Sequence, residues 1–230
     1  MKITVIHGQN HKGSTYNIAK ELCDKLSGEV TEFFLPKDFE CFCKGCTACF
    51  TDERKCPDYE KLRPITEAMD NADVIILTSP VYVMHATGAM KAFLDHYGYR
   101  FMVHRPEEKM FRKQAVCIST AAGAGMGSTI KDMADSTFFW GIAKTYKLGI
   151  AVMETRWEKV KPEIKAKINK KTTSIAKKII RKAGKVKPDI KTKGFFTIMS
   201  MMQKNGFNPA DVEYWKEKGW TNGKRPWKEL

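Results

Sequence analysis

Short apolar stretches alternate with longer helical patterns over the first 155 residues of this 230-residue chain. The strongest strand pattern is Asp73 to Ser79 (DVIILTS), whose continuous apolar run is typical of a parallel strand buried on both faces. Four further strands are expected at Lys2 to Ile6, Glu29 to Leu35, Gln114 to Thr120 and Lys147 to Met153. Helices are expected at Thr15 to Leu26, Pro64 to Asn71, Gly88 to Tyr97 and Ser128 to Tyr146.

This alternation limits the possible folds. Parallel strands need crossover connections, and those crossovers are right-handed in nearly all known cases. Five such strands predict an α/β fold with a doubly wound five-stranded parallel sheet in the flavodoxin-like order 2-1-3-4-5. Ligands of such sheets bind at the carboxyl ends of the first, third and fourth strands. The segments at those ends are HGQNHKGST, SPVYVMHATG and TAAGAGMG, all rich in small, hydroxyl or amide side chains.

The first segment has the features of a phosphate-binding turn. It lies between a strand and a helix start, where free backbone N–H groups attract an anion. The order of its glycines is neither that of a Walker loop nor G-x-G-x-x-G, which argues against ATP and a dinucleotide here. The alternative is an ordinary turn with a capping residue. The candidate phosphate contacts are Gln9, His11, Lys12, Gly13, Ser14 and Thr15.

The other two segments favour a flat aromatic ligand. In the second, the proline predicts an extended turn, the aromatic and imidazole side chains can flank a ring, and apolar side chains can cover it. Its candidate contacts are Pro80, Val81, Tyr82, Val83, Met84 and His85. In the third, glycines let the backbone approach a planar group closely. Its candidate contacts are Thr120, Ala121, Ala122, Gly123 and Gly125. A ring held by two loops with a phosphate in a third predicts FMN as the cofactor.

On these residues the chain resembles the NADPH-dependent FMN reductase and iron–sulfur flavoprotein group of flavodoxin-like proteins. The resemblance covers residues 2–155 and rests on Gly8 with Gly13-Ser14-Thr15, Ser79 to Tyr82, Lys91 to Asp95 and Thr120 to Gly125. It implies that the three loops hold the phosphate, the isoalloxazine ring and its pyrimidine edge, and that NAD(P)H is the electron donor. Family members often have Ser-Pro-Arg after the first glycine. Here Gln9-Asn10-His11 stands there, so phosphate binding is expected to depend more on Lys12 and the hydroxyls.

Five of the seven cysteines fall in a cysteine-rich loop, residues 41–57. From Cys43 the spacing is C-x2-C-x2-C-x6-C, and a proline follows the last cysteine. This spacing resembles ferredoxin-type ligation of a [4Fe–4S] cluster and the compact motif of iron–sulfur flavoproteins. The candidate ligands are Cys43, Cys46, Cys49 and Cys56. Zinc and free or redox-active thiols are the alternatives. Cys41 is the fifth thiol of the loop.

The charge is concentrated in the last third of the chain. Residues 1–155 contain 19 basic and 19 acidic side chains, whereas residues 156–230 contain 21 and 7 and so carry the whole net charge of +14. We therefore expect an FMN-binding domain at 1–155 and a basic helical extension at 156–230. Apolar side chains from Val160 to Ile179 form a stripe on the first helix of this extension. This stripe predicts packing on the body or on a second subunit. Docking of an acidic redox protein such as ferredoxin is the next interpretation, and neither nucleic acid nor a membrane surface is expected to bind.

The sequence thus predicts a cytoplasmic FMN-dependent NAD(P)H oxidoreductase that forms a dimer or tetramer. It shows neither a signal peptide nor an apolar run long enough to span a membrane. The flavin carries the redox chemistry, so no side chain is assigned as catalytic. His104 and Arg105 would bind an anionic substrate or a nicotinamide phosphate if they lie near the flavin, or else lie in an exposed loop. The alternatives in function are a non-catalytic flavodoxin-like electron carrier and a zinc-stabilised module that binds nucleic acid through the basic helix.

Overall fold

The computed structural model describes residues 1–228 and is built on one five-stranded, all-parallel sheet. The strand order β2-β1-β3-β4-β5 confirms the predicted doubly wound, flavodoxin-like fold. Pairing runs across the sheet in one register, with Ile3 opposite Val74 and Val74 opposite Gln114. The strands are β1 (Lys2–His7), β2 (Glu29–Phe34), β3 (Val74–Pro80), β4 (Gln114–Ala121) and β5 (Lys144–Ala151).

The central strand β3 accounts for the apolar run that dominates the sequence. Every side chain from Val74 to Ser79 is buried, because helices cover both faces of the sheet at this strand. Ile75 and Leu77 pack into one apolar core, and Ile76 packs into the other. Burying one such side chain adds about 1.5–3 kcal/mol to the free energy of unfolding. Because side chains of β3 enter both cores, this strand holds the two helical layers together.

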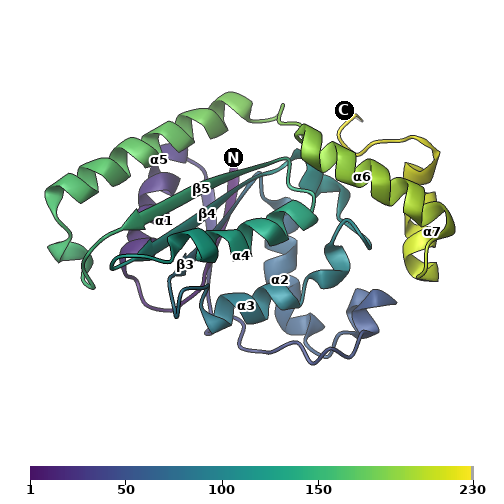
Figure 1. Ribbon diagram of the computed structural model, residues 1–230, viewed down its shortest axis with the longest axis horizontal. Helices are drawn as coiled ribbons and strands as arrows, with labels where there is room; N and C mark the ends of the chain where they lie inside the picture. The colour runs from purple at the N-terminus through teal and green to yellow at the C-terminus, as the bar shows by residue number, and fades with distance from the viewer. Residues whose placement is uncertain (229–230) are drawn as a thin grey trace.

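Two layers of helices enclose the sheet (Figure 1). One face is covered by α1 (Ser14–Leu26) and α5 (Pro162–Lys182), whose buried side chains include Ile18 and Ile168. The other face is covered by α2 (Tyr59–Asn71), α3 (Gly88–Asp95) and α4 (Met126–Phe139). The loops that lead into α1, α3 and α4 therefore meet at the carboxyl ends of β1, β3 and β4.

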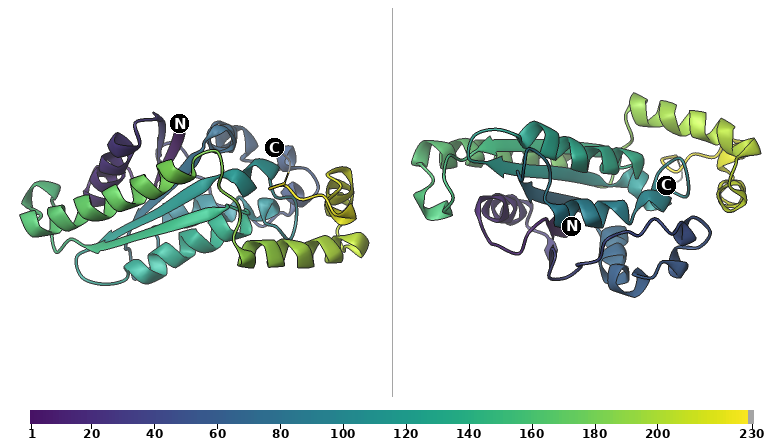
Figure 2. Two further views of the ribbon diagram at one scale, coloured as in Figure 1. Left: turned by 90° about the horizontal axis from the view of Figure 1, so that it is seen from above. Right: turned by 60° about the horizontal axis from the view of Figure 1, so that its bottom comes forward.

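The C-terminal extension packs on the body along two surfaces. Its helix α5 lies against α1, where Lys25 Nζ donates a hydrogen bond to Thr172 Oγ1 at 2.6 Å. Helices α6 (Ile190–Met202) and α7 (Pro209–Glu217) lie at the end of the molecule opposite the strand arrowheads (Figure 2). There Phe196 and Trp215 form a third apolar core with Met102 and Phe111 of the body. No helix among residues 1–228 has both the length and the apolar composition that crossing a bilayer requires.

The predicted start of α2 was wrong. The helix begins at Tyr59, and Pro64 lies inside it rather than in its first turn. Leu62, Ile65 and Met69 form the buried stripe of the helix, so the stripe extends across the proline. Burial of Leu62 against the core favours a helix that begins earlier, even though Pro64 lacks an N–H donor.

The predicted boundary between α4 and β5 was also wrong. The helix ends at Phe139 instead of Tyr146, and β5 covers Lys144–Ala151 instead of 147–153. Gly141 has a φ of 85°, and a Cβ there would lie 2.6 Å from the ring of Phe111. This left-handed turn ends the helix at a position that only glycine fits well. Helical periodicity does not reveal such a tertiary contact.

Candidate functional site

Three loops converge at the carboxyl ends of β1, β3 and β4, as predicted. The loop after β1 is tied to the loop after β3, because Tyr82 Oη donates a hydrogen bond to Gln9 Oε1 at 2.9 Å. Thr87 Oγ1 donates to the carbonyl of Gly8 at 2.5 Å and makes a second link between these two loops. The loop after β3 is tied to β4, since the Val81 N–H donates to the Thr120 carbonyl at 2.9 Å. The structure thus brings together residues that are far apart in the sequence.

The N-terminus of α1 has unused hydrogen-bond donors. Its N-cap residue, Gly13, has no side chain to cap the helix, and the first turn contains no acidic residue. The hydroxyl of Ser14 is buried and has no hydrogen-bond partner among the described residues. Thr15 is also buried, and the imidazole of His11 packs over Gly13. An uncapped helix end with a buried free hydroxyl is the arrangement that a phosphate group needs.

Lys12 and His7 lie beside this helix end. Lys12 Nζ lies over the rings of Tyr16 and Phe34, 5.1 and 5.5 Å from their centroids. His7 is buried, with Nε2 2.9 Å from Glu32 Oε1 and its ring stacked on Phe34. Burial lowers the pKa of His7, and the hydrogen bond that His7 donates to Glu32 opposes that effect. Sequence reasoning missed His7 and Glu32, because their pairing across β1 and β2 depends on the strand register.

The loop after β3 forms a strained hairpin. Tyr82 and His85 exchange backbone hydrogen bonds of 2.9 and 3.0 Å, and Val83 and Met84 at its tip have φ values of 47° and 68°. A left-handed conformation is costly for a β-branched residue, and strain of this kind is common at ligand sites. Val83 is 96% exposed and Met84 55% exposed, so much of the apolar tip is uncovered by the part of the chain that the structure describes.

Asp132 of α4 holds the end of this hairpin. Its Oδ2 accepts a hydrogen bond from the Ala86 N–H at 3.1 Å and lies 3.1 Å from His85 Nδ1. The second nitrogen of His85 therefore points away from Asp132. Sequence reasoning missed Asp132, since a single carboxylate on a helix gives no signal of its tertiary partner.

The loop after β4 packs tightly against the hairpin. Gly125 has a φ of 92° and caps α4, and a Cβ there would lie 2.5 Å from Val81 Cγ1. The carbonyls of Ala121 and Ala122 accept hydrogen bonds from the backbone beyond β5. Gly123 is exposed, with open space where a Cβ would lie. The loop therefore offers a bare backbone surface beside the hairpin.

The four predicted metal ligands line one cavity, together with residues at the end of α3. Burial raises the pKa of Cys49, and the nearby thiols of Cys56, Cys43 and Cys46 raise it further. Burial likewise raises the pKa of Cys56. The four thiols therefore gather around the same cavity. The backbone here is irregular, with Gly45 and Thr47 both at positive φ.

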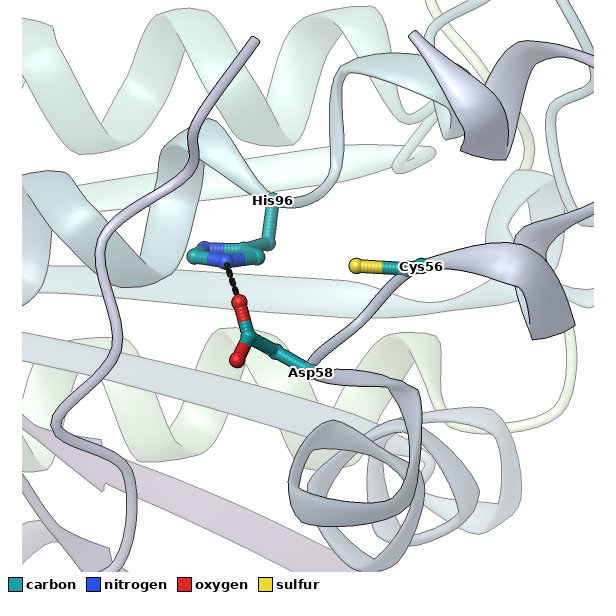
Figure 3. Close-up of side chains that lie close together, drawn as sticks. All are labelled: Cys56, Asp58 and His96. Atoms are coloured by element: carbon teal, nitrogen blue, oxygen red, sulfur yellow. Dashed lines mark hydrogen bonds and ion pairs between the residues drawn. The ribbon is translucent and has the colours of Figure 1, made fainter. Parts of the chain in front are cut away.

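Asp58 and His96 lie next to Cys56 (Figure 3). His96 is buried, its Nδ1 donates to the Ala92 carbonyl at 2.8 Å, and its Nε2 lies 3.2 Å from Asp58 Oδ2. The ligating atoms of Cys56, Asp58 and His96 all lie within 4.8 Å of one another. Burial raises the pKa of Asp58, but hydrogen bonds from Cys41 and His96 outweigh it and leave the pKa lowered. Sequence reasoning missed Asp58 and His96, although the segment Cys56-Pro57-Asp58 was a local signal.

His104 and Arg105 do not lie beside the three loops. Arg105 Nη2 donates to the Cys49 carbonyl at 2.6 Å, and its side chain is 9% exposed. The His104 ring packs against Phe50, 4.5 Å between centroids. Both earlier interpretations, a substrate contact near the flavin and an exposed loop, were wrong. Contacts with the cysteine-rich loop and α7 hold both residues.

Comparison with known families agrees with this geometry. Residues 1–157 match the family described as NADPH-dependent FMN reductase. The chain belongs to this family. Membership of the NADPH-dependent FMN reductase family confirms the predicted enzyme class, an NAD(P)H-dependent flavin oxidoreductase, at the level of the family.

Two iron–sulfur flavoproteins of Archaeoglobus fulgidus are similar to this family member. One is 30% identical over 98 residues, 41% of this chain and 48% of the relative, so the match spans about half of that protein. The other is 27% identical over 184 residues, 77% of this chain and 79% of the relative. Among solved structures, an azoreductase of Bacillus anthracis superposes with a TM-score of 0.60 at 12% identity, covering 77% of this chain and 99% of that one. This last likeness shows the fold.

Proposed function

We propose that the chain is an FMN-dependent NAD(P)H oxidoreductase that holds FMN in the three loops at the carboxyl ends of β1, β3 and β4. The observation that carries the proposal is the buried Ser14 hydroxyl, which has no partner among the described residues and lies at the uncapped N-terminus of α1. Together with Thr15 and the backbone of Gly13, it fits a phosphate group. Family membership supports FMN as the group that carries this phosphate.

The other two loops would hold the ring of FMN. The Tyr82–Gln9 hydrogen bond positions the hairpin beside the phosphate loop, and the exposed tip at Val83 and Met84 provides apolar cover. The bare backbone at Gly123 admits a planar group at close range, and Gly125 lets the hairpin pack against this loop. Bound FMN supplies the hydride-transfer chemistry, while these loops supply binding and orientation.

Flavin titration of the Ser14→Ala variant tests this proposal. The variant should bind FMN about 10- to 100-fold more weakly, because a hydrogen bond to a charged group contributes about 1.5–3 kcal/mol. Riboflavin has no phosphate, so its affinity should not change. Ser174→Ala, an exposed serine on α5, is the matched control. Equal losses of affinity for FMN and riboflavin, or no loss for either, would contradict the phosphate assignment.

We also propose a [4Fe–4S] cluster on Cys43, Cys46, Cys49 and Cys56. The donor set fits, because four thiols line one cavity and four thiolates are the usual ligands of such a cluster. The names of the Archaeoglobus relatives support iron–sulfur binding. Asp58 and His96 form a polar wall of the same cavity and add oxygen and nitrogen donors that a zinc ion would also accept.

Anaerobic purification distinguishes a [4Fe–4S] cluster from bound zinc and from metal-free thiols. The protein should contain iron and acid-labile sulfide and show a broad visible absorption beneath the flavin bands. Cys43→Ser with Cys56→Ser should remove the iron and that absorption and leave the flavin in place. Cys41→Ser, from the same loop, is the control that should retain both. Bound zinc, or metal-free thiols in the purified protein, would overturn the cluster assignment.

Two further predictions concern partners and catalysis. We propose that the protein forms a homo-oligomer. We also propose that an acidic redox protein docks on the exposed lysines of α5, such as Lys177 and Lys178. Steady-state NAD(P)H oxidation with added flavin or quinone distinguishes the oxidoreductase from a non-catalytic electron carrier, which would show almost no turnover. A colourless protein that binds zinc would favour the module that binds nucleic acid.

A further inference from the structure

Helix α7 contacts the cysteine-rich loop through a buried charge cluster. Asp211 is 1% exposed, and its two carboxylate oxygens engage two side chains of the body. Oδ1 accepts a hydrogen bond from Arg105 Nη1 at 2.9 Å, and Oδ2 lies 2.8 Å from His104 Nδ1. Both contacts span more than a hundred residues of sequence, so they exist only in the folded protein.

Arg105 transmits this contact to the backbone of the loop. Nη1 also donates to the Phe50 carbonyl at 2.7 Å, and Nη2 donates to the Cys49 carbonyl at 2.6 Å. A guanidinium that bridges two successive carbonyls is held in a single orientation when a buried carboxylate also accepts a hydrogen bond from it. Asp211 is that carboxylate.

Asn208 adds a third donor, to one of these two carbonyls. It is the N-cap of α7, where its Oδ1 accepts a hydrogen bond from the Ala210 N–H at 3.1 Å. Its Nδ2 donates to the Phe50 carbonyl at 2.9 Å. The side chains of Arg105, Asn208 and Asp211 form a clamp on the loop, and we call it the α7 clamp.

The loop has little regular secondary structure near Cys49. The segment from Cys41 to Thr47 has no helix or strand, and Ala48–Phe50 is a single short 3-10 turn. Metal ligands must be placed within a fraction of an ångström to close a site, and outer contacts usually supply that precision. Here the contacts reach the carbonyl of Cys49 itself.

We infer that Asp211 is a positioning residue for the Cys49 ligand, acting through Arg105 and together with Asn208. The C-terminal extension thereby completes the cysteine site rather than serving only as a packing surface. This inference rests on the proposed cluster and assigns to α7 a part in holding it.

Limited trypsin cleavage of the apo and cluster-loaded protein tests the clamp without using activity. The loop presents Lys44, Arg54 and Lys55 as exposed cleavage sites. Asp211→Asn should speed cleavage of the apo protein by about tenfold, because native-state proteolysis follows the population of the opened loop. Glu213→Gln removes the same charge from an exposed position of α7 and should cleave like the wild type. Asn208→Asp is the second variant, because it retains the helix cap and loses the donor to Phe50.

The loaded protein adds an independent readout. Asp211→Asn and Asn208→Asp should change the electron paramagnetic resonance signal of the reduced cluster or lower its iron content, while the flavin content stays at the wild-type level. If Asp211→Asn and Asn208→Asp both show the cleavage rate and the resonance signal of Glu213→Gln, the inference is overturned. A wild-type protein without any cluster would overturn the proposed function, and the apo cleavage rates would still decide whether the clamp holds the loop.

Discussion

A single buried amine shows how strongly this fold controls charge. Lys113 is 6% exposed, and its Nζ donates to the backbone carbonyls of Asp70 and Ala72. Burial lowers its pKa to about 8, although the nearby charge of Asp70 opposes the shift. The Lys113 amine is therefore partly deprotonated in mildly alkaline solution.

This burial predicts how stability depends on pH. Between the folded pKa of about 8 and an unfolded pKa of about 10.4, the unfolded chain binds more protons at Lys113 than the folded chain does. The free energy of unfolding should therefore rise with pH in that window, by up to about 3 kcal/mol from this residue. Urea unfolding of the wild type and of Lys113→Met at pH 8 and pH 10.5 isolates the contribution. A constant difference between the two proteins would contradict it.

Residues at the candidate site differ in how far the sequence predicts them. Ser14 begins α1 and Gly125 caps α4, and both lie in segments whose composition and position after a strand already indicate binding. Asp132, Asp58 and Asp211 act through partners on other elements, and nothing in the local sequence names those partners. A carboxylate gains its role from tertiary contacts, so pattern analysis cannot assign it.

At the scale of elements, helices and strands also differ in how far the sequence predicts them. The strand β3 is predictable, because burial on both faces demands a continuous apolar run. The start of α2 and the end of α4 are not, because they depend on the packing of Leu62 and on the ring behind Gly141. Element type follows from periodicity, whereas element length follows from neighbours in space.

The proline inside α2 leads to a prediction about that helix. Pro64 is exposed, and it leaves the carbonyl of Glu60 without its usual helical N–H donor. Pro64→Ala restores that donor and removes the clash of the ring, and it leaves the buried stripe unchanged. The free energy of unfolding should rise by about 1–3 kcal/mol. Chemical denaturation measures it, with Glu67→Ala on the same exposed face as the control, and a less stable Pro64→Ala protein would refute this account of the helix.

At the scale of the whole molecule, the surplus charge lies on the C-terminal extension, where α5 has eight basic side chains and one acidic one. The described residues of the extension share apolar cores with the body, so their lysines form a fixed basic surface. A fixed surface of one sign steers an oppositely charged partner and loses that effect in salt.

This surface predicts how reduction of an acidic redox protein depends on salt. The second-order rate should fall by about tenfold or more as salt rises from 0.01 to 0.5 M, because the Debye length shrinks well below the size of the surface. Lys177→Glu with Lys178→Glu should lower the rate at low salt. Lys37→Glu with Lys109→Glu, which makes the same change in net charge elsewhere on the surface, should have a smaller effect. Rates that do not respond to salt would leave α5 as a packing helix only.

Helix α3 joins the two candidate cofactor sites directly. Its N-cap, Thr87, contacts Gly8 in the phosphate loop, and His96 at its other end faces Asp58 beside the cysteines. The eight residues of the helix span about 12 Å, and each residue turns the chain by about 100°. A single inserted residue would therefore rotate one site by more than a quarter turn relative to the other. We expect relatives that use both sites to vary the exposed side chains of this helix, such as Lys91 and Asp95, and to keep its number of residues unchanged.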